Sequence, residues 1–490
     1  MLTVRECLQI GLESLDAQRP SWEFRQRNFE GNQDLPFAPD GVNREYLALR
    51  EQSVANFLDL AMNGPIQRLR ADGFTTGRDK EADLTAWSEI WQANKLDVRQ
   101  RIVYQQMMVH GRGIMAVSAN PQNRASPKVT VENSRRVWLE PNPENPFETL
   151  FAVKTFTVRA PDSALILPAS VAPVQRVAYV YDATRWYRFE ARGMAGNNWV
   201  ESASGEHNLG QVPFVGFDFN VDADGVPHDS ISKLIPAQNA VNTIRFNTLL
   251  AMQFSAFRQR AITGFDPIMR DSSGNPIVKL DEHGDPELDE NGQEVPVLQS
   301  PGRIGVDRAL VFPGSDTKVF DLPESNLENY IKVYDTFLTS LFAAGQIPPQ
   351  YLLTRMSNMS GDALASAEST LQALVKDLQT AAGESLEQVM RLANRARGED
   401  YADVASEVIW GDAEARSFAQ IVDAITKLIS TGMSREDAWS MLPGATPPKV
   451  QTWVDNAEDE ASRSLLSLTK ESNDTGINEP VLPEATAADA

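Results

Sequence analysis

The chain has 490 residues, and at about 150 residues per domain this length predicts about three compact units. Lys and Arg total 45 against 67 Asp and Glu, a formal net charge of −22, so the surface repels duplex DNA unless basic side chains gather locally. The single cysteine, Cys7, excludes an intrachain disulfide framework and a cysteine-rich zinc module.

The amino-terminal segment carries charges where a secretory signal needs an unbroken apolar core, and no run of about 18 apolar residues occurs. We therefore expect neither export nor a membrane span. Residues 1–110 are expected to be mostly helical. The clearest helix is expected over 81–110, where large apolar residues recur at helical spacing. These residues are Leu84, Trp87, Trp91, Val98 and Ile102.

A β-rich lobe is expected from Gly113 to about Phe219. Short β-branched and aromatic runs alternate there with Pro, Asn and Gly clusters, which is typical of strands and turns. Within it, the stretch VQRVAYVYDATRWYRFE predicts a hairpin that turns near Asp182 and Ala183.

Two long helices are then expected around a small β insertion. The first runs from about Ser230 to Arg260, about 45 Å at 1.5 Å per residue, and is rich in Asn, Gln and Ala. Residues 263–322 string together turn signals and predict small hairpins. The second helix covers about 324–344.

A polar loop with two prolines, GQIPPQYLLTRMSNMSGD, follows the second helix. A third helix is expected from Asp362 to about Arg397, with an apolar seam of three-four spacing and a bend at Gly383. Shorter helices are predicted over 417–431 and 434–442, and prolines then predict turns. The acidic tail from about Lys470 lacks aromatic residues and is expected to be mobile.

Motifs for nucleotide chemistry are weak in this sequence. It contains no Gly-Lys pair and hence no phosphate-binding P-loop. GRGIMA, residues 111–116, matches a dinucleotide fingerprint, but it follows a helix and opens a strand, the reverse of the required order. We interpret it as a helix-to-strand turn and expect no cofactor.

Metal and catalytic motifs are equally weak. DFNVDADGVPHD places Asn220, Asp222, Asp224 and Gly225 at calcium-loop positions, but Ile231 occupies the twelfth place, which needs a bidentate carboxylate. We therefore favour a plain Asp-Gly turn. Four widely spaced histidines form no zinc or triad motif, so we assign no catalytic residue and no metal ligand and expect no enzyme activity.

A few basic residues are notable for their positions. Arg258 and Arg260 are expected on the first long helix together with Arg245, Lys332 on the second, and Arg355 in the polar loop. Taken singly, such residues are typical of solvated helix faces.

The ordered set of elements resembles the portal proteins of long-tailed double-stranded DNA bacteriophages. Three groups of phrases carry the resemblance: NFEGNQDLPF with SVANFLDLAMNGPIQRLRADGF, then PAQNAVNTIRFNTLLAMQFSAFRQRAITG, then SGDALASAESTLQALVKDLQ. It covers most of the chain and implies a mainly helical α+β portal fold with a mixed α/β lobe. The implied regions are wing 1–229, first stem helix 230–262, clip 263–323, second stem helix 324–344, tunnel loop 345–361, bent spine helix 362–404, crown 405–469 and tail 470–490.

The resemblance also implies a function. Family members form a homo-dodecameric ring at one capsid vertex, dock the large terminase packaging ATPase, and act as the conduit for DNA packaging and ejection. They contact the major capsid and scaffold proteins, and later join the head to a tail adaptor protein. The expected location is the virion, and the host cytoplasm during assembly, with no membrane contact.

Residue roles follow from the same resemblance. Arg355, Met356, Ser357, Asn358 and Met359 are expected to line the narrowest part of the channel. Lys332, Arg258 and Arg260 are candidates for sparse basic rings in the stem, in a tunnel whose twelve chains of −22 would together carry −264 formal charges. In the clip, we expect hairpins of neighbouring subunits to pair edge to edge.

Two other classes remain open on sequence grounds. One is a carboxylate metal-dependent hydrolase or transferase, and the other is a cytosolic helical scaffold. A ring with a central hole in electron micrographs would distinguish the portal reading from both.

Overall fold

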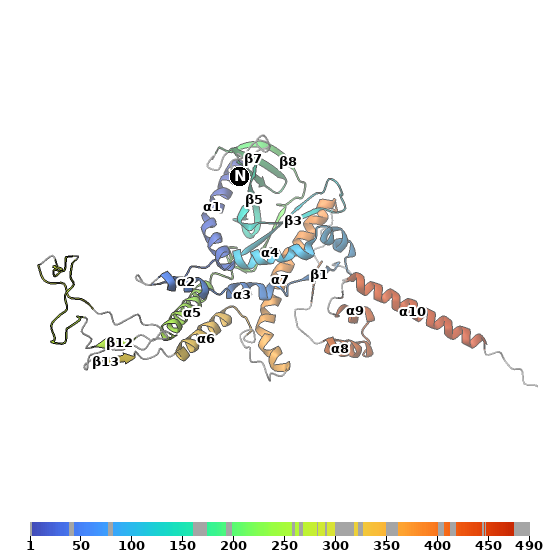
Figure 1. The fold of residues 1–490 in the computed structure, drawn as a ribbon. Coiled ribbons are helices and arrows are strands. Elements are labelled where there is room, and N and C mark those ends of the chain that lie inside the picture. Colours follow the sequence, from blue (N-terminus) through green and yellow to red (C-terminus); the bar gives the residue numbers. More distant parts are fainter. Residues whose placement is uncertain are drawn as a thin grey trace, which may run out of the picture. The chain divides into compact units, whose positions relative to one another are not determined.

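Helices alternate with small sheets along the chain, which confirms the predicted α+β class (Figure 1). The computed structural model describes residues 2–38, 44–76, 82–159, 174–192, 198–256, 260–263, 268–281, 283–289, 292–298, 318–321, 327–348, 361–399, 406–411, 418–442, 445 and 447–474. The chain divides into two units. Unit 1 is Met1–Asn32, Asn56–Ile235 and Phe342–Ala490, and unit 2 is Gln33–Ala55 and Pro236–Leu341.

The predicted β-rich lobe of unit 1 contains a five-stranded antiparallel sheet. Its order is β4 (Val137–Asn142), β5 (Asn145–Arg159), β6 (Val174–Tyr181), β7 (Arg185–Arg192) and β8 (Val200–Glu206). The predicted hairpin is confirmed as β6 and β7, with Tyr181 opposite Trp186. Asp182 fixes the turn, because its Oδ1 accepts hydrogen bonds from the backbone N–H groups of Thr184 and Arg185, both at 2.7 Å.

Helix α1 (Val4–Phe29) covers this sheet (Figure 1). It begins with a capping box in which Thr3 and Glu6 each accept the other's backbone N–H. Leu8 packs into a buried cluster with Val153 and Phe189 of the sheet. Hydrophobic burial along one helix face therefore holds α1 to the lobe.

A second sheet, of order β3 (Lys128–Glu132), β2 (Arg112–Ser118) and β9 (Phe214–Asp218), is antiparallel throughout. Gly111, with φ 90°, ends helix α4 (Leu96–His110), and strand β2 begins at the next residue, so GRGIMA is the helix-to-strand turn that we expected. The short 3₁₀ helix η2 (Ser134–Arg136) connects β3 to β4.

The prediction of a single helix over 81–110 is wrong. Residues Ala86–Gln92 form the π-helix η1, Lys95 takes the left-handed conformation at φ 55°, and α4 is Leu96–His110. Trp91 Nε1 donates to Asp97 Oδ1 at 2.8 Å across the break, which gives this buried indole a partner. Trp87 and Trp91 lie on η1, whereas Val98 lies on α4 and is 75% exposed, so the apolar pattern that we took for one stripe is divided between two helices.

The helix expected from Asp362 is confirmed as α7 (Gly361–Arg397). Its seam is buried at Leu371 and Leu378, and the helix continues through Gly383, where the Trp410 ring nitrogen lies 3.7 Å from the position of an added Cβ. The bend at Gly383 stays a prediction. Trp410 belongs to β14 (Val408–Trp410), which pairs with β1 (Ala71–Phe74) across more than 300 residues of chain.

The remaining helices of unit 1 are α3 (Phe57–Ile66), α8 (Phe418–Ser430), α9 (Arg435–Ser440) and α10 (Pro447–Asp474). Helices α8 and α9 agree with the sequence, and Ser434 caps α9 through the N–H of Asp437 at 3.0 Å. Helix α10 was missed, since we expected the prolines to give turns. Proline has no backbone N–H, and the N–H groups of the first helical turn form no intrahelical hydrogen bond. Pro447 therefore fits at the start of α10.

Unit 2 contains α2 (Arg44–Ser53), all but the first residue of α5 (Ile235–Ala256), and α6 (Leu327–Ala344) as far as Leu341. Helix α5 is shorter than the 230–262 expected for the first stem helix, and Arg260 does not lie on it. Arg260 opens β12 (Arg260–Thr263), which pairs with β13 (Lys318–Asp321), so that Ile262 lies opposite Val319. The partner strand is more than 50 residues away, which helical periodicity cannot reveal.

Over the described ranges, no helix has the length and apolarity that a bilayer crossing requires.

Candidate functional site

Most of the channel residues expected from sequence lie outside the described residues: Arg355, Met356, Ser357, Asn358, Met359 and Arg258. Arg260 lies in β12, as given above. Lys332 lies on α6, where its Nζ is 2.8 Å from Glu328 Oε1, and both side chains are about 70% exposed. An exposed pair of this kind contributes about 0–1 kcal/mol, so the ammonium remains available to another anion.

Helix α5 is almost free of charge. Arg245 is the only charged residue among its 22, and its Nε donates to the backbone oxygen of Ser53 at 2.7 Å. A surface with so few cations makes few phosphate contacts.

A buried amide network anchors α5 within unit 2. Asn242 Nδ2 donates to Gln33 Oε1 at 2.6 Å, and Asn242 Oδ1 accepts from the N–H of Ala55 at 3.1 Å. Gln238 Nε2 donates to the oxygen of Ala55 at 2.6 Å and to Asn242 Oδ1 at 3.0 Å. Both side chains are at most 1% exposed, so each bond is made where water cannot replace it.

Helices α5 and α6 lie near each other (Figure 1) and, with Gln52 of α2, line an open pocket of about 300 Å³. Its walls combine apolar and polar side chains from three elements. They are Gln52, Arg245, Thr248, Leu249, Ile331 and Tyr334. These six lining residues include no acid–base pair, so they do not form a catalytic site.

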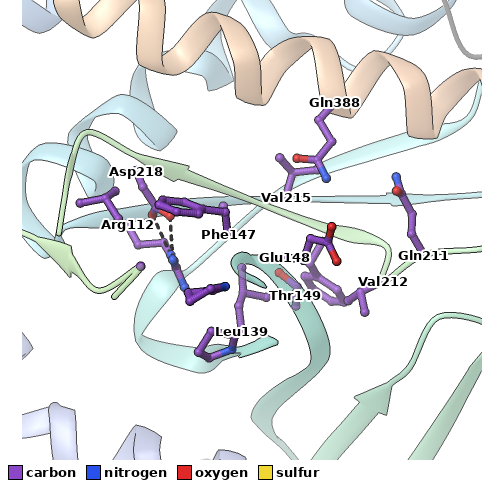
Figure 2. Close-up of a pocket in the computed structure, with 16 residues that line it drawn as sticks. Arg112, Leu139, Phe147, Glu148, Thr149, Gln211, Val212, Val215, Asp218 and Gln388 are labelled. Carbon is purple, nitrogen blue, oxygen red and sulfur yellow. Dashed lines mark hydrogen bonds and ion pairs between the residues drawn. The ribbon is translucent and has the colours of Figure 1, made fainter. Parts of the chain in front are cut away.

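A second cavity, of about 410 Å³, lies in unit 1 between β9, the β4–β5 turn and Gln388 of α7 (Figure 2). At one end Arg112 and Asp218 form a two-point ion pair, Nε to Oδ1 at 2.7 Å and Nη2 to Oδ2 at 2.6 Å. Because the guanidinium is neutralised there and Glu148 adds a carboxylate, the cavity does not attract phosphate.

His110 is the buried titratable group beside this lobe. It is 7% exposed, its Nε2 is 2.9 Å from Gln26 Oε1, and burial, helped by Arg135 and Arg25, lowers its pKa to about 4. The histidine is therefore neutral at pH 7 and part of the core.

The suspected calcium loop is a turn, as we expected. β10 (Asn220–Val221) pairs with β11 (Pro227–His228), and Asp222 Oδ1 accepts from the N–H groups of Asp224 and Val226 at 3.0 and 2.9 Å. These bonds and His228 at 3.1 Å hold the pKa of Asp222 below its usual value. In the part of the chain that the structure describes, no three His, Cys, Asp or Glu side chains lie close enough to hold a metal ion.

Comparison with known proteins gives matches over most of the chain. The model of the family "Phage portal protein, SPP1 Gp6-like" matches residues 12–465. The portal protein of Mycobacterium phage D29 is 27% identical over 388 residues, 75% of this chain and 70% of that one. The portal protein of Mycobacterium phage L5 is 26% identical over 399 residues, 76% and 72% of the two chains.

Among solved structures, a chain of the neck of an empty GTA particle, computed with C6 symmetry, aligns with a TM-score of 0.42 at 10% identity, over 84% of this chain and 97% of that one. The family match extends over nearly the whole sequence and includes both units. The chain therefore belongs to the SPP1 Gp6-like family of phage portal proteins.

Proposed function

We propose that this chain forms a homo-dodecameric ring at one capsid vertex, through which double-stranded DNA enters during packaging and leaves during ejection. The observation that carries the proposal is the family match over residues 12–465. In this proposal the ring also docks the terminase ATPase, contacts the capsid and scaffold proteins and, later, binds a head-tail adaptor. The virion is its final location and the host cytoplasm its site of assembly.

The paired helices α5 and α6 are proposed as the stem that lines the channel. At 1.5 Å per residue, α5 and α6 measure about 33 and 27 Å. A conduit must let duplex DNA slide, and every firm phosphate contact increases the affinity of the wall for the DNA. One charged residue on α5 and the exposed Lys332–Glu328 pair on α6 are compatible with that requirement.

Exposed apolar side chains of the same helices support self-association. Val333 and Phe337, four residues apart on one face of α6, are 46% and 42% exposed, and Met252 on α5 is 50% exposed. Complete burial of a side chain of this size contributes about 1.5–3 kcal/mol, and only about half of each is still exposed, so covering them contributes roughly 1 kcal/mol each. We propose that neighbouring copies of the chain cover them.

The remaining regional assignments are proposed with the boundaries given by the sequence, except that α5 limits the first stem helix to Ile235–Ala256. Residues 1–229 form the wing, 263–323 the clip, 324–344 the second stem helix, 362–404 the spine, 405–469 the crown and 470–490 the tail. The tunnel loop is 345–361, and Arg355 with Met356 to Met359 lines the narrowest passage.

Negative-stain images of the purified full chain test the ring. We expect particles with a central hole, and Phe337→Asp is expected to shift the population to single chains on gel filtration. Asn329→Asp, an equal change of charge at an exposed polar position of α6, should leave the rings intact. Solitary particles without a hole would refute the proposal.

A second experiment tests the tunnel loop. The triple variant Arg355→Ala, Met356→Ala, Met359→Ala is expected to assemble into rings yet to package or retain less DNA, measured as the nuclease-protected genome per particle. Parental packaging and retention by this variant would show that the loop does not line the passage.

A further inference from the structure

Three segments of unit 1 line an open pocket of about 830 Å³. They are the loop from β2 to β3, the loop from β8 to β9, and the carboxyl end of α7 with the two residues that follow it. Arg124 lines the pocket from the first segment and Arg395 from the third, and both residues are exposed. None of the lining residues belongs to α5, α6 or the tunnel loop, to which the channel lining is assigned.

A backbone oxygen holds each of these two arginines in place. Arg124 Nε donates to Arg397 O at 3.1 Å, and Arg395 Nη1 donates to Leu209 O at 3.2 Å. A guanidinium carries more N–H donors than one such bond uses, so both groups keep donors for a ligand. Among the residues that the structure describes, no carboxylate forms an ion pair with either guanidinium.

Arg397, two residues after Arg395, differs in this respect. Its Nη1 is 2.9 Å from Glu89 Oε2 and its Nη2 is 2.8 Å from Glu399 Oε1, so its charge is already balanced by carboxylates. Glu399 also lines the pocket. Two arginines and this one glutamate give the lining a formal charge of +1, in a chain whose net charge is −22.

Two glycines with positive φ lie against the guanidinium groups. Gly398 has φ 94°, and a Cβ added to it would collide with Arg124 Nη2. Gly210 has φ 68°, and its added Cβ would lie 3.8 Å from Arg395 Nη1. Gly398 therefore leaves the space that the Arg124 guanidinium occupies, and Gly210 lies in van der Waals contact distance of the other.

Side-chain hydrogen bonds fix both loops of the pocket. Asn120 Nδ2 donates to Ser126 O at 2.9 Å across the β2–β3 loop. In the β8–β9 loop, His207 Nε2 donates to Asp182 O at 3.0 Å, and its Nδ1 accepts from Leu209 N at 3.3 Å. Because the loops are fixed before a ligand arrives, little conformational entropy is lost on binding.

The pair of guanidinium groups favours phosphate over carboxylate. A guanidinium forms two parallel hydrogen bonds to one edge of either anion. A carboxylate presents one such edge, whereas a phosphate presents several and can accept from two guanidinium groups at once. The pocket is larger than a phosphate ion, so the phosphate can also belong to a larger molecule.

We infer that this pocket binds a phosphate group between Arg124 and Arg395. The free phosphate ion and the phosphodiester of a DNA backbone present the same oxygens to the two arginines. The inference goes beyond the proposed function, because it assigns a ligand to residues of unit 1 that are not part of the channel lining.

Two probes test the site on the purified full chain at constant ionic strength. Equilibrium dialysis against radiolabelled orthophosphate measures binding of the free ion, and fluorescence anisotropy of a short labelled DNA duplex measures binding of the phosphodiester. Arg124→Gln and Arg395→Gln should each lower the affinity for the probe that binds about tenfold or more, the effect of losing a charged hydrogen bond. Arg5→Gln, the same loss of charge at an exposed position of α1, should change the affinity by less than about twofold.

Two further variants alter the pocket without removing an arginine. Gly398→Ala should also weaken binding, because its Cβ displaces the Arg124 guanidinium. Gly432→Ala is the matched control: Gly432 has φ 105° and no atom within 4 Å of an added Cβ, so the variant has the same backbone strain and should bind normally. Glu399→Gln should strengthen binding about two- to fivefold, because it removes a negative charge from the lining.

Affinity for either probe that depends on both arginines supports the inference, and the probe that binds identifies the source of the phosphate. Thermal unfolding of each variant shows that a lost affinity is not a lost fold. Three outcomes would overturn the inference: neither probe binds, the arginine variants bind as the parent does, or acetate displaces the probe as well as phosphate does.

Discussion

Replacing Asn242 by alanine tests the buried amide network that anchors α5. The change removes three hydrogen bonds, to Gln33 Oε1 at 2.6 Å, from Ala55 N at 3.1 Å and from Gln238 Nε2 at 3.0 Å. A buried bond contributes about 1 kcal/mol, and a buried group left without that partner costs about 1–3 kcal/mol. We expect a loss of about 3–5 kcal/mol in the free energy of opening unit 2.

Hydrogen–deuterium exchange measures this opening directly, because unit 2 contains no tryptophan to report it by fluorescence. A loss of about 3 kcal/mol corresponds to exchange about 100-fold faster for the amides of α5. The effect should be confined to peptides of unit 2.

Asn239 provides a matched control on the same helix. Its Oδ1 is buried and has no hydrogen-bond partner among the described residues, so Asn239→Ala removes no side-chain bond of that oxygen and gains helix propensity. We expect a change within about 0.5 kcal/mol. Equal exchange rates in the two variants would refute the assignment of stability to the network.

Two further predictions concern unit 1. Gly11→Ala should destabilise it by about 1–3 kcal/mol, because an added Cβ would lie 2.6 Å from Val153 Cβ. Gly64→Ala meets no atom within 4 Å and should stabilise α3 by about 0.5–1 kcal/mol. Thermal unfolding compares the two variants, and equal shifts in their melting temperatures would contradict the packing argument. For His110 the folded pKa of about 4 lies below the ordinary 6.5, so the unfolded chain takes up the proton first as the pH falls. About 3 kcal/mol of folding stability that is present above pH 6.5 is therefore lost as the pH falls to 4. His110→Gln should remove this part of the pH dependence in urea titrations at pH 7 and pH 4.5, and an unchanged difference between the two pH values would show that His110 is not its source.

The helices with one clear apolar face were predictable from sequence. The expected 324–344 and 362–397 became α6 and α7, and the hairpin at Asp182 followed from its turn residues, because spacing and turn chemistry are local. The break at Lys95 was not predictable, because a π-helix followed by a left-handed residue preserves enough periodicity to look continuous.

The candidate channel was predicted only in outline. Position along the sequence assigned Arg260 to the stem helix, but pairing with Asp321 places it in a strand. Lys332 lies on the second helix as expected, and its ion pair with Glu328, four residues earlier, is a local contact that helical spacing allows. The loop from Arg355 to Met359 stays a prediction from the family resemblance.

The sequence by itself determined the α+β class, most helices, the absence of a phosphate-binding motif, and the family resemblance that the family match confirmed. These features depend on residue types and on spacings within a few turns of chain. Only the tertiary structure decided that Asn242 anchors α5, that Trp410 closes over Gly383, and that Arg124 and Arg395 line one pocket. Such contacts join residues that are distant in sequence, and a backbone donor finds its acceptor only when the whole chain is folded.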